Sequence, residues 1–212
     1  MIELAFCLVG GYLLGSISGA LTLGRLRGID IRTMGSGNAG GTNALRTIGW
    51  RFALGVVLID VGKGAAAAGV LPLIAPWLVP DPLDFPTLAA AGGFMAVAGH
   101  VWPAYFRFRG GKGAGTAVGA IAVVAPWCLA PLLLVWLVTL IGTGYVGLAT
   151  ILAGVSLVPA MWTLGPDPLP HALAVLAIAL AVLLVFTHRA NLTRMLAGDE
   201  NRFEKARLLK RR

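Results

Sequence analysis

Residues 114–142 read AGTAVGAIAVVAPWCLAPLLLVWLVTLIG, an apolar run of 29 residues that is broken at Ala125-Pro126 and again at Pro131. One membrane-spanning helix needs about 20 apolar residues, so the run is long for one crossing and short for two. Proline lacks the N–H that an inner helical turn requires and therefore interrupts a helix. Whether this run crosses the membrane once or twice decides the topology of the whole chain.

The composition places the chain in a membrane. Of its 212 residues, 58% are hydrophobic and 12% are charged, and the mean hydropathy is +0.84. A soluble domain carries about twice that share of charged residues. The polar stretches, residues 24–51, 104–113 and 188–212, are each too short to bury a core of their own. We therefore expect an all-α integral membrane protein in which residues 1–212 form a single polytopic domain.

Further apolar runs are long enough for membrane spans at about 1.5 Å per helical residue. They cover residues 4–23, 52–73, 87–105, 145–164 and 172–187. Together with residues 114–142 they predict six or seven crossings. Glu3 precedes the first run and no basic segment does, so this run is typical of a retained span rather than a cleavable signal.

The distribution of cations selects seven crossings. Of 17 Lys and Arg residues, five lie in 24–51, three in 104–113 and eight in 188–212, which leaves Lys63 alone inside a span. The loops near 76–86, 125–131 and 163–171 contain no Lys or Arg. Positive residues collect on the cytoplasmic side, and all three basic stretches reach that side only if 114–142 crosses as two short helices. We predict seven transmembrane helices with the N-terminus outside and the C-terminus in the cytoplasm.

Three polar motifs, residues 35–46, 99–116 and 188–200, should then share the cytoplasmic face. The second motif, GHVWPAYFRFRGGKGAGT, combines His100 and three cations with the glycines Gly110, Gly111 and Gly113. Successive glycines let backbone N–H groups converge on a phosphate, and Lys112 supplies a positive charge. The alternative is a loop whose cations only follow the positive-inside rule. The motif is not a Walker A sequence, because Gly113 follows Lys112 where Ser or Thr is required.

The first motif contains GSGNAGGTN, residues 35–43, followed by Arg46. Its match to GxGxxG is a false positive for dinucleotide binding, since this chain offers no βαβ unit. A glycine-rich loop with hydroxyl, amide and guanidinium donors can still bind an oxyanion or a phosphate. Alternatively, its polar residues only form turns. The candidates are Gly35, Ser36, Gly37, Asn38, Gly40, Thr42, Asn43 and Arg46.

The third motif, HRANLTRMLAGDE, places His188, Asn191 and Arg194 at intervals of three on one face of a helix end. A basic tail that binds anionic lipid is the alternative reading of this region. That reading accounts for Arg202, Lys205, Arg207, Lys210, Arg211 and Arg212. It does not account for His188 or Asn191.

Asp60 and Lys63 lie three residues apart in the second predicted span and can pair. Ionisable residues at membrane depth are costly and usually serve a function. We expect them to support the site rather than to act in catalysis.

A metal centre is not predicted. Cys7 and Cys128 lie in apolar surroundings without CxxC or Cys/His spacing, so we expect neither zinc nor a disulfide. His100, His171 and His188 are far apart in sequence and form no HExxH motif.

Four segments together carry a family resemblance. GSGNAGGTN with Arg46, DVGKG at 60–64, GHVWPAYFRFRGGKGAGT and HRANLTRMLAGDE resemble the successive signature motifs of the bacterial acyl-phosphate:glycerol-3-phosphate acyltransferase family, PlsY. The likeness covers the whole chain in order and spacing. It implies a seven-span enzyme of the bacterial cytoplasmic (inner) membrane, with its active site facing the cytoplasm. Such an enzyme moves a fatty acyl group from acyl phosphate to the sn-1 hydroxyl of glycerol 3-phosphate, giving lysophosphatidic acid and phosphate, the first step of phospholipid synthesis.

The resemblance also assigns residues. It implies glycerol 3-phosphate binding by Gly110, Gly111, Lys112 and Gly113, and it matches Ser36, Asn38, Arg46, His188 and Asn191 to the other polar positions. We expect Ser36, Arg46, Lys112, His188 and Asn191 to be catalytic. We expect substrate to contact Gly35, Gly37, Asn38, Gly40, Thr42, Asn43, His100, Gly110, Gly111, Gly113 and Arg194. The chain departs from the family at 144–150, where it reads GYVGLAT in place of the family's Arg and Ser residues.

The chemistry of this reaction fits these residues. Acyl phosphate is a mixed anhydride with a good leaving group, so no covalent acyl-enzyme and no cofactor is expected. The protein must bring two phosphates together and stabilise an oxyanion. His188, His100 or the donor's own phosphate can take the hydroxyl proton, and the sequence does not choose between them. The expected partners are acyl phosphate, glycerol 3-phosphate, membrane lipid and the enzyme that supplies acyl phosphate, with no nucleic acid.

Two other functions compete with this one. A membrane transporter for an anionic phosphorylated solute also uses broken helices and glycines. Against it, the polar residues gather at one face and no internal repeat is visible. An acyltransferase that uses acyl-CoA or acyl-carrier protein would typically show His-x4-Asp, and none of the three histidines has Asp five residues later.

Overall fold

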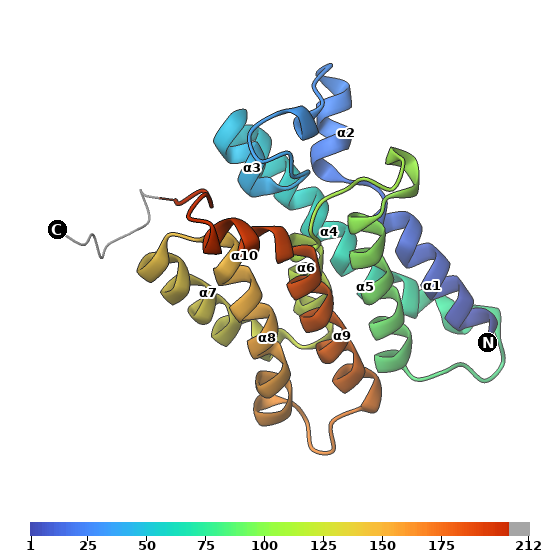
Figure 1. The fold of residues 1–212 in the computed structure, drawn as a ribbon. Helices are drawn as coiled ribbons and strands as arrows, with labels where there is room; N and C mark the ends of the chain where they lie inside the picture. Colours follow the sequence, from blue (N-terminus) through green and yellow to red (C-terminus); the bar gives the residue numbers. More distant parts are fainter. Residues whose placement is uncertain (204–212) are drawn as a thin grey trace. The chain divides into compact units, whose positions relative to one another are not determined.

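The computed structural model describes residues 1–203, and every regular element in that range is a helix (Figure 1). The predicted all-α fold is therefore confirmed for the described residues. The chain divides into two compact units, Met1–Val124 and Ala125–Arg212, each with its own internal packing. The single-domain prediction stays a prediction. Lys205, Arg207, Lys210, Arg211 and Arg212 of the predicted basic tail lie outside the described residues.

The first unit contains six α-helices and three short 3-10 helices. In chain order they are α1 (Ile2–Gly15), α2 (Gly19–Leu26), η1 (Ile31–Thr33), α3 (Gly41–Thr47), α4 (Trp50–Ile74), η2 (Ala75–Leu78), α5 (Phe85–Val101), η3 (Ala104–Phe106) and α6 (Ala114–Val124). The second unit contains η4 (Pro126–Cys128), α7 (Leu129–Thr143), α8 (Val146–Leu164), α9 (His171–Thr187) and α10 (Arg189–Leu196).

Helices of the first unit approach one another through glycine. α1 packs on α5, and both α5 and α6 pack on α4. A Cβ added at Gly15 would collide with the backbone of Ala96, and one added at Gly64 would collide with the backbone of Thr116. Lipid is as apolar as leucine, so close backbone contact of this kind is a main source of helix attraction in a membrane. A large side chain at either glycine would force two helices apart.

The first expected span, residues 4–23, is divided into two helices. α1 ends at Gly15, α2 begins at Gly19, and their axes are bent by 46°. The hydroxyl of Ser16 donates to the carbonyl of Tyr12 at 2.8 Å, and the N–H of Gly19 donates to the carboxylate of Asp60 at 3.0 Å. These side chains satisfy backbone and hydroxyl groups at the break, which hydrocarbon cannot do.

The apolar run 114–142 forms two helices, α6 and α7, as predicted from its prolines. α6 ends at Val124, and Ala125–Cys128 separates it from α7. Pro126 starts η4, and Pro131 lies in the first turn of α7, where the missing N–H has no helical partner to lose. Only the first of the two predicted breaks therefore ends a helix.

Three helical stretches in the described part of the chain are long and apolar enough to cross a membrane: Trp50–Leu78, Pro126–Thr143 and Val146–Leu164. Two bent pairs, α1 with α2 and α9 with α10, raise the number to five if each pair is one span. α6 is a shorter apolar helix of 11 residues. The predicted helices themselves are present near their expected positions, but the number of seven crossings stays a prediction.

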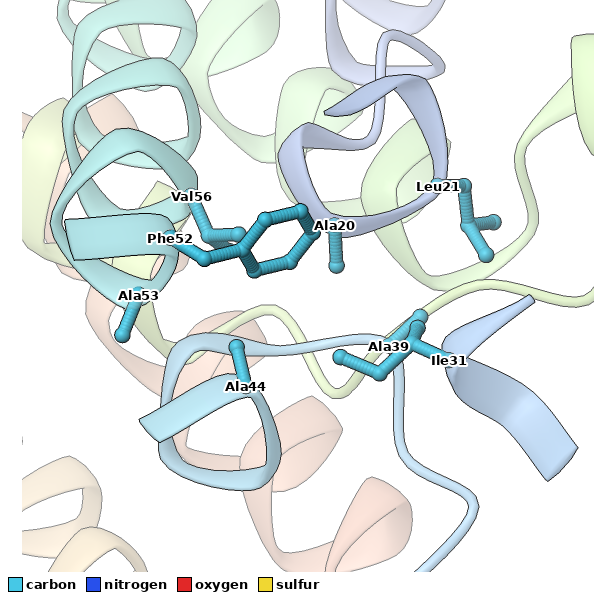
Figure 2. Packing of buried hydrophobic residues seen from close by; sticks show 8 residues of the cluster. All are labelled: Ala20, Leu21, Ile31, Ala39, Ala44, Phe52, Ala53 and Val56. Atoms are coloured by element: carbon cyan, nitrogen blue, oxygen red, sulfur yellow. The ribbon is translucent and has the colours of Figure 1, made fainter. Parts of the chain in front are cut away.

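A core cluster of eight buried residues fixes the first motif to the helices beside it (Figure 2). Phe52 and Val56 come from α4, Ala20 from α2, and Ala39 and Ala44 from the first motif; Leu21, Ile31 and Ala53 complete the cluster. Arg25 lies over the ring of Phe106 and Arg27 over that of Phe52, both at 5.2 Å. Burial of apolar surface contributes roughly 25 cal/mol per Å² to stability. The cluster therefore stabilises the packing of the glycine-rich loop against α2 and α4.

In the second unit, α8 packs between α7 and α9 and also contacts α10. Gly147 of α8 faces the side chain of Asn191, and Gly154 faces Leu184, so both glycines make room for residues of the following helices. This packing holds the third motif, which begins at the junction of α9 and α10.

Candidate functional site

Asn43 organises the first motif. Its side chain is 1% exposed, and its carboxamide oxygen accepts from the N–H of Ser36 at 3.0 Å. Its nitrogen donates to the carbonyls of Ile31 at 3.3 Å and Met34 at 2.9 Å. All of these contacts lie within the loop and its flank. The structure thus gives Asn43 a supporting position, whereas its predicted contact with substrate stays a prediction.

Two glycines give the first motif its shape. Gly35 and Gly37 have φ of 56° and 71°, in the left-handed region that side chains rarely adopt. Asn43 also occupies the space that a Cβ at Gly35 would need. Ser36 lies between these glycines and is exposed, as are the side chains of Thr42 and Arg46. Ser36 is therefore presented by a loop whose backbone Asn43 fixes, and Thr42 and Arg46 lie on α3, the helix that follows this loop.

The second motif folds back on the end of α5. Gly110 N–H donates to the carbonyl of Val101 and Gly111 N–H to that of His100, both at 3.1 Å. Gly113 then turns the chain into α6 with φ of 88°. Lys112 lies between these fixed points, next to the N-terminus of α6. Helix N-termini bear partial positive charge, so this position suits an anion.

The first and second motifs meet at Gly111. A Cβ added to Gly111 would lie 2.6 Å from the carbonyl oxygen of Ala39 and would collide with Nε2 of His100. The two glycine-rich loops are therefore adjacent within the first unit.

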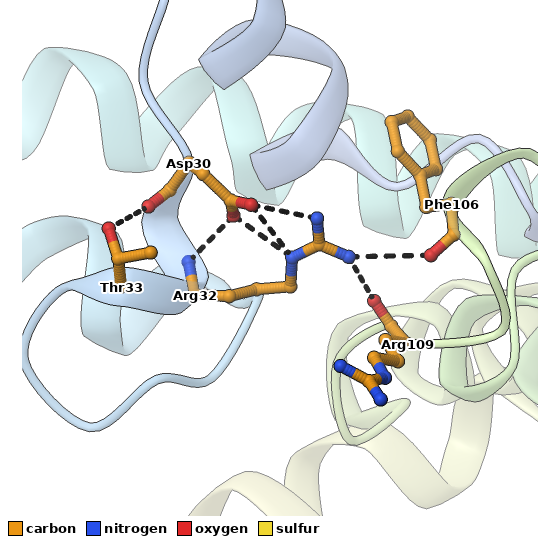
Figure 3. Close-up of polar contacts among 5 residues, drawn as sticks. All are labelled: Asp30, Arg32, Thr33, Phe106 and Arg109. Atoms are coloured by element: carbon orange, nitrogen blue, oxygen red, sulfur yellow. Dashed lines mark hydrogen bonds and ion pairs between the residues drawn. The ribbon is translucent and has the colours of Figure 1, made fainter.

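Arg32, which lies just before the first motif, connects the segment around η1 to the second motif (Figure 3). Its guanidinium binds the carboxylate of Asp30, with Nη2 at 2.8 Å, and donates through Nη1 to the carbonyls of Phe106 at 3.3 Å and Arg109 at 3.2 Å. The hydrogen bond from Arg32 holds the pKa of Asp30 below its usual value. Asp30 also caps η1 by accepting from the N–H of Arg32.

A basic hollow of about 450 Å³ opens beside this ion pair. Its lining combines both motifs and includes Asp30, Arg32, Thr33, Gly37, Arg107, Arg109 and Gly110. Arg107 and Phe108 both have φ of 57°, which is unusual for residues with a side chain. Such strain persists where the surrounding structure enforces it and is common at binding sites. Three arginines and two glycines make this hollow suited to an anion.

Behind the second motif lies a buried cluster of ionisable residues. Lys63 Nζ lies 2.9 Å from Asp60 Oδ1 and 2.8 Å from His100 Nδ1, while His100 Nδ1 lies 3.3 Å from Asp60 Oδ1. All three residues are buried: Asp60 is 4% exposed, Lys63 7% and His100 3%. The predicted pairing of Asp60 with Lys63 is confirmed. The sequence did not reveal that His100 completes it.

In the third motif, His188 and Asn191 are buried. Nδ1 of His188 lies 2.8 Å from the carbonyl of Leu184, which can only accept, so the neutral ring bears its proton on Nδ1. Nε2 is then the basic nitrogen. Asn191 Nδ2 and Arg194 Nε both donate to the carboxylate of Glu200 at 2.7 Å.

Several supporting residues were not predicted. Glu200 binds two of the predicted site residues, and its place in the GDE sequence that ends the third motif was the available signal. Asp30 and Arg32 are opposite charges two residues apart, and this spacing does not predict that Arg32 also binds the carbonyl of Arg109. Among the described residues, no group of three or more His, Cys, Asp or Glu side chains is arranged to hold a metal ion.

The fold and the loops together define a class of protein: an integral membrane protein, all-helical over the described residues, whose glycine-rich loops and arginines form a basic hollow. The sequence profile of the glycerol-3-phosphate acyltransferase family matches residues 5–198, and the chain belongs to this family. A glycerol-3-phosphate acyltransferase of Shouchella clausii is 40% identical, covering 97% of this chain and 98% of its own. One of Chlorobium chlorochromatii is 38% identical, covering 95% and 97%.

Two solved structures agree with that assignment. The crystal structure of PlsY, an integral membrane glycerol 3-phosphate acyltransferase, in its glycerol 3-phosphate form has a TM-score of 0.83 at 34% identity, covering 94% of this chain and 95% of that one. Its lysophosphatidic acid form has a TM-score of 0.81 at 32% identity, covering 96% and 97%. The family resemblance found in the four motifs is thereby confirmed.

Proposed function

We propose that this protein transfers a fatty acyl group from acyl phosphate to the sn-1 hydroxyl of glycerol 3-phosphate, yielding lysophosphatidic acid and phosphate. The strongest support is the match over nearly the whole chain to PlsY structures in glycerol 3-phosphate and lysophosphatidic acid forms, the acceptor and product of such a transfer. The donor follows from the family resemblance of the motifs.

The acceptor's phosphate is assigned to the second motif. Lys112, the N-terminus of α6 and Gly113 offer positive charge and N–H groups at one place, whereas Gly110 and Gly111 use their own N–H groups to fix the loop to the end of α5. The basic hollow lined by Arg32, Arg107 and Arg109 adjoins Gly110 and favours the arrival of a dianion. Ser36, Arg46 and the glycines of the first motif are assigned to the donor and to the oxyanion of the reaction.

The reaction itself needs no covalent enzyme intermediate. The sn-1 hydroxyl oxygen attacks the acyl carbon, and a tetrahedral oxyanion forms. The bond from that carbon to the phosphate oxygen then breaks, and phosphate leaves with the electron pair. The hydroxyl proton goes to Nε2 of His188, whose Nδ1–H is engaged by Leu184, or to the donor's phosphate. Asn191 is assigned to catalysis together with His188, and Asn38, Gly40, Thr42, Asn43 and Arg194 are assigned to substrate orientation.

The topology belongs to the same proposal. Residues 1–212 act as one membrane domain with seven spans, the N-terminus outside and the C-terminus in the cytoplasm of a bacterium. The split of residues 114–142 into α6 and α7 supports the count, and the cation distribution supports the orientation. The acyl chain of the donor then reaches the site laterally from lipid. The enzyme that produces acyl phosphate is the expected upstream partner.

A single assay tests the activity. Purified protein is incubated with labelled glycerol 3-phosphate and either acyl phosphate or acyl-CoA. We expect labelled lysophosphatidic acid with acyl phosphate only. Product formed equally well from acyl-CoA would overturn the donor, and no product from either would overturn the activity.

A further inference from the structure

The buried cluster of Asp60, Lys63 and His100 has contacts on two sides that the proposed reaction does not use. On one side it binds the break between α1 and α2: Lys63 Nζ donates to the carbonyl of Ile17 at 3.0 Å, and Asp60 accepts from the N–H of Gly19 at 3.0 Å. Helical hydrogen bonding is interrupted at this break, and in a membrane interior such groups need protein partners. The ion pair therefore stabilises the bend of 46°.

On its other side the cluster supports the second motif. An ammonium group can only donate, so its 2.8 Å contact requires an unprotonated Nδ1 on His100. The ring of His100 then bears its proton on Nε2. That nitrogen faces Gly111, where any Cβ would collide with it. The carbonyl of the same histidine accepts from the N–H of Gly111 at 3.1 Å.

We propose that Asp60, Lys63 and His100 are positioning residues that couple the bend between α1 and α2 to the backbone of the glycine loop before Lys112. His100 then contacts neither substrate nor the reacting proton. This role differs from the one expected from its motif, where His100 is a substrate contact or a base. The inference rests on the proposed function only for its kinetic readout.

Further contacts make the bend and the loop one assembly. Ser16 Oγ accepts from the N–H of Ala104 at 3.2 Å, and Tyr12 donates to the carbonyl of Trp102 at 2.7 Å. Their partners, Ala104 and Trp102, both lie just after α5, between His100 and the glycines of the second motif. Loss of the cluster should therefore displace the loop locally while the rest of the first unit keeps its packing.

The first test is kinetic and compares His100→Ala with His100→Gln, neither of which can act as a base. The Gln amide can replace the contact that the imidazole makes toward Gly111. We expect His100→Ala to raise KM for glycerol 3-phosphate about tenfold with a smaller change in kcat, and His100→Gln to recover most of that loss. The acidic limb of the pH–rate profile should remain in both variants. An equal loss of kcat in both, with KM unchanged, would overturn the proposal.

The second test needs no turnover, so it separates this inference from the proposed activity. Hydrogen–deuterium exchange is measured on wild type and on Asp60→Asn/Lys63→Met, which removes both charges and leaves no unpaired ion. We expect exchange at residues 108–113 to rise about tenfold or more, with α8 and α9 unaffected. Asp84→Ala is the matched control, because Asp84 caps the opposite end of α5 through Thr87 N–H. Similar exchange in all three proteins, or a uniform rise along the chain, would reject the coupling.

Discussion

The carboxamide oxygen of Asn43 accepts the backbone N–H of Ser36 at 3.0 Å, across seven residues of the first motif. Through this bond and two others, one buried side chain sets the path of a loop that presents an exposed serine. The geometry of Ser36 thus depends on a residue that the sequence places among the substrate contacts.

Asn43→Asp should therefore lower activity strongly, although the two side chains are nearly equal in size. The carboxylate keeps an acceptor for Ser36 N–H but loses two donors and faces the carbonyls of Ile31 and Met34. Each lost buried hydrogen bond costs about 1–3 kcal/mol, so we expect activity to fall by about tenfold or more and the thermal midpoint to decrease. Thr47→Val is the control, because the hydroxyl of Thr47 donates to the backbone carbonyl of Asn43 rather than to its side chain. Wild-type activity in Asn43→Asp would show that the loop does not depend on these bonds.

Lys112→Ala should lose most activity while the protein remains folded. A charge-assisted contact to a buried anion contributes about 1.5–3 kcal/mol, and about 4 when it also stabilises the transition state, so a loss of roughly 10- to 1,000-fold is expected. Lys112→Arg restores the charge, but its wider, planar guanidinium does not fit where a compact ammonium binds, so we expect it to recover little activity. The measurement is activity at sub-saturating glycerol 3-phosphate. Activity near that of wild type would mean that Lys112 only follows the positive-inside rule.

The proposed orientation is testable with single reporter cysteines. Cys7 and Cys128 are buried and are first replaced by alanine. In that background, Arg109→Cys and Leu196→Cys should react with an impermeant maleimide only after the cells are opened, whereas Asp81→Cys should react from outside. The reason is that 16 of the 17 cations lie in the stretches assigned to the cytoplasm. Labelling of Arg109→Cys in intact cells would contradict the shared face of the motifs.

Stability should depend on Asp30 in a pH-dependent way. The pKa of Asp30 lies below its usual 3.8 because Arg32 binds its charged form, so the unfolded chain takes up the proton more readily than the folded one. The pair therefore stabilises fully near neutral pH and loses its effect as pH falls below about 5. The pair is partly exposed, and solvent limits its contribution to about 0.2–1 kcal/mol.

The measurement compares thermal midpoints of wild type and Asp30→Asn. We expect a small deficit in the variant at pH 7 that shrinks in acid and disappears once the pH falls below the lowered pKa of folded Asp30, where Asp30 is protonated in both states. Asp81→Asn serves as the control for removing an exposed carboxylate. A deficit that stays constant over this range would show that the charge on Asp30 is not its source.

Helix positions and the left-handed turns at loop glycines such as Gly37 and Gly113 could be predicted from the sequence, because apolar run length and glycine content are local properties. The break at Ala125-Pro126 is an example, since proline acts on its own turn. Contacts between distant residues could not be predicted. Lys63 binds Ile17 and His100, and Arg32 binds the carbonyl of Arg109, through tertiary packing that no spacing encodes. The bend at Ser16–Ser18 depends on the same packing.

The close glycine contacts of the first unit also limit how this protein can be engineered for crystallisation or heat tolerance. Glycine-to-alanine exchange in helices commonly raises stability by up to about 1 kcal/mol. At Gly11, Gly15 and Gly64 a new methyl group would meet main chain from a neighbouring helix, so the same exchange should unfold the protein there. At Gly62 and Gly142 an added Cβ has no heavy atom of another described part of the chain within 4 Å. These two helix positions are where thermostabilising libraries should begin.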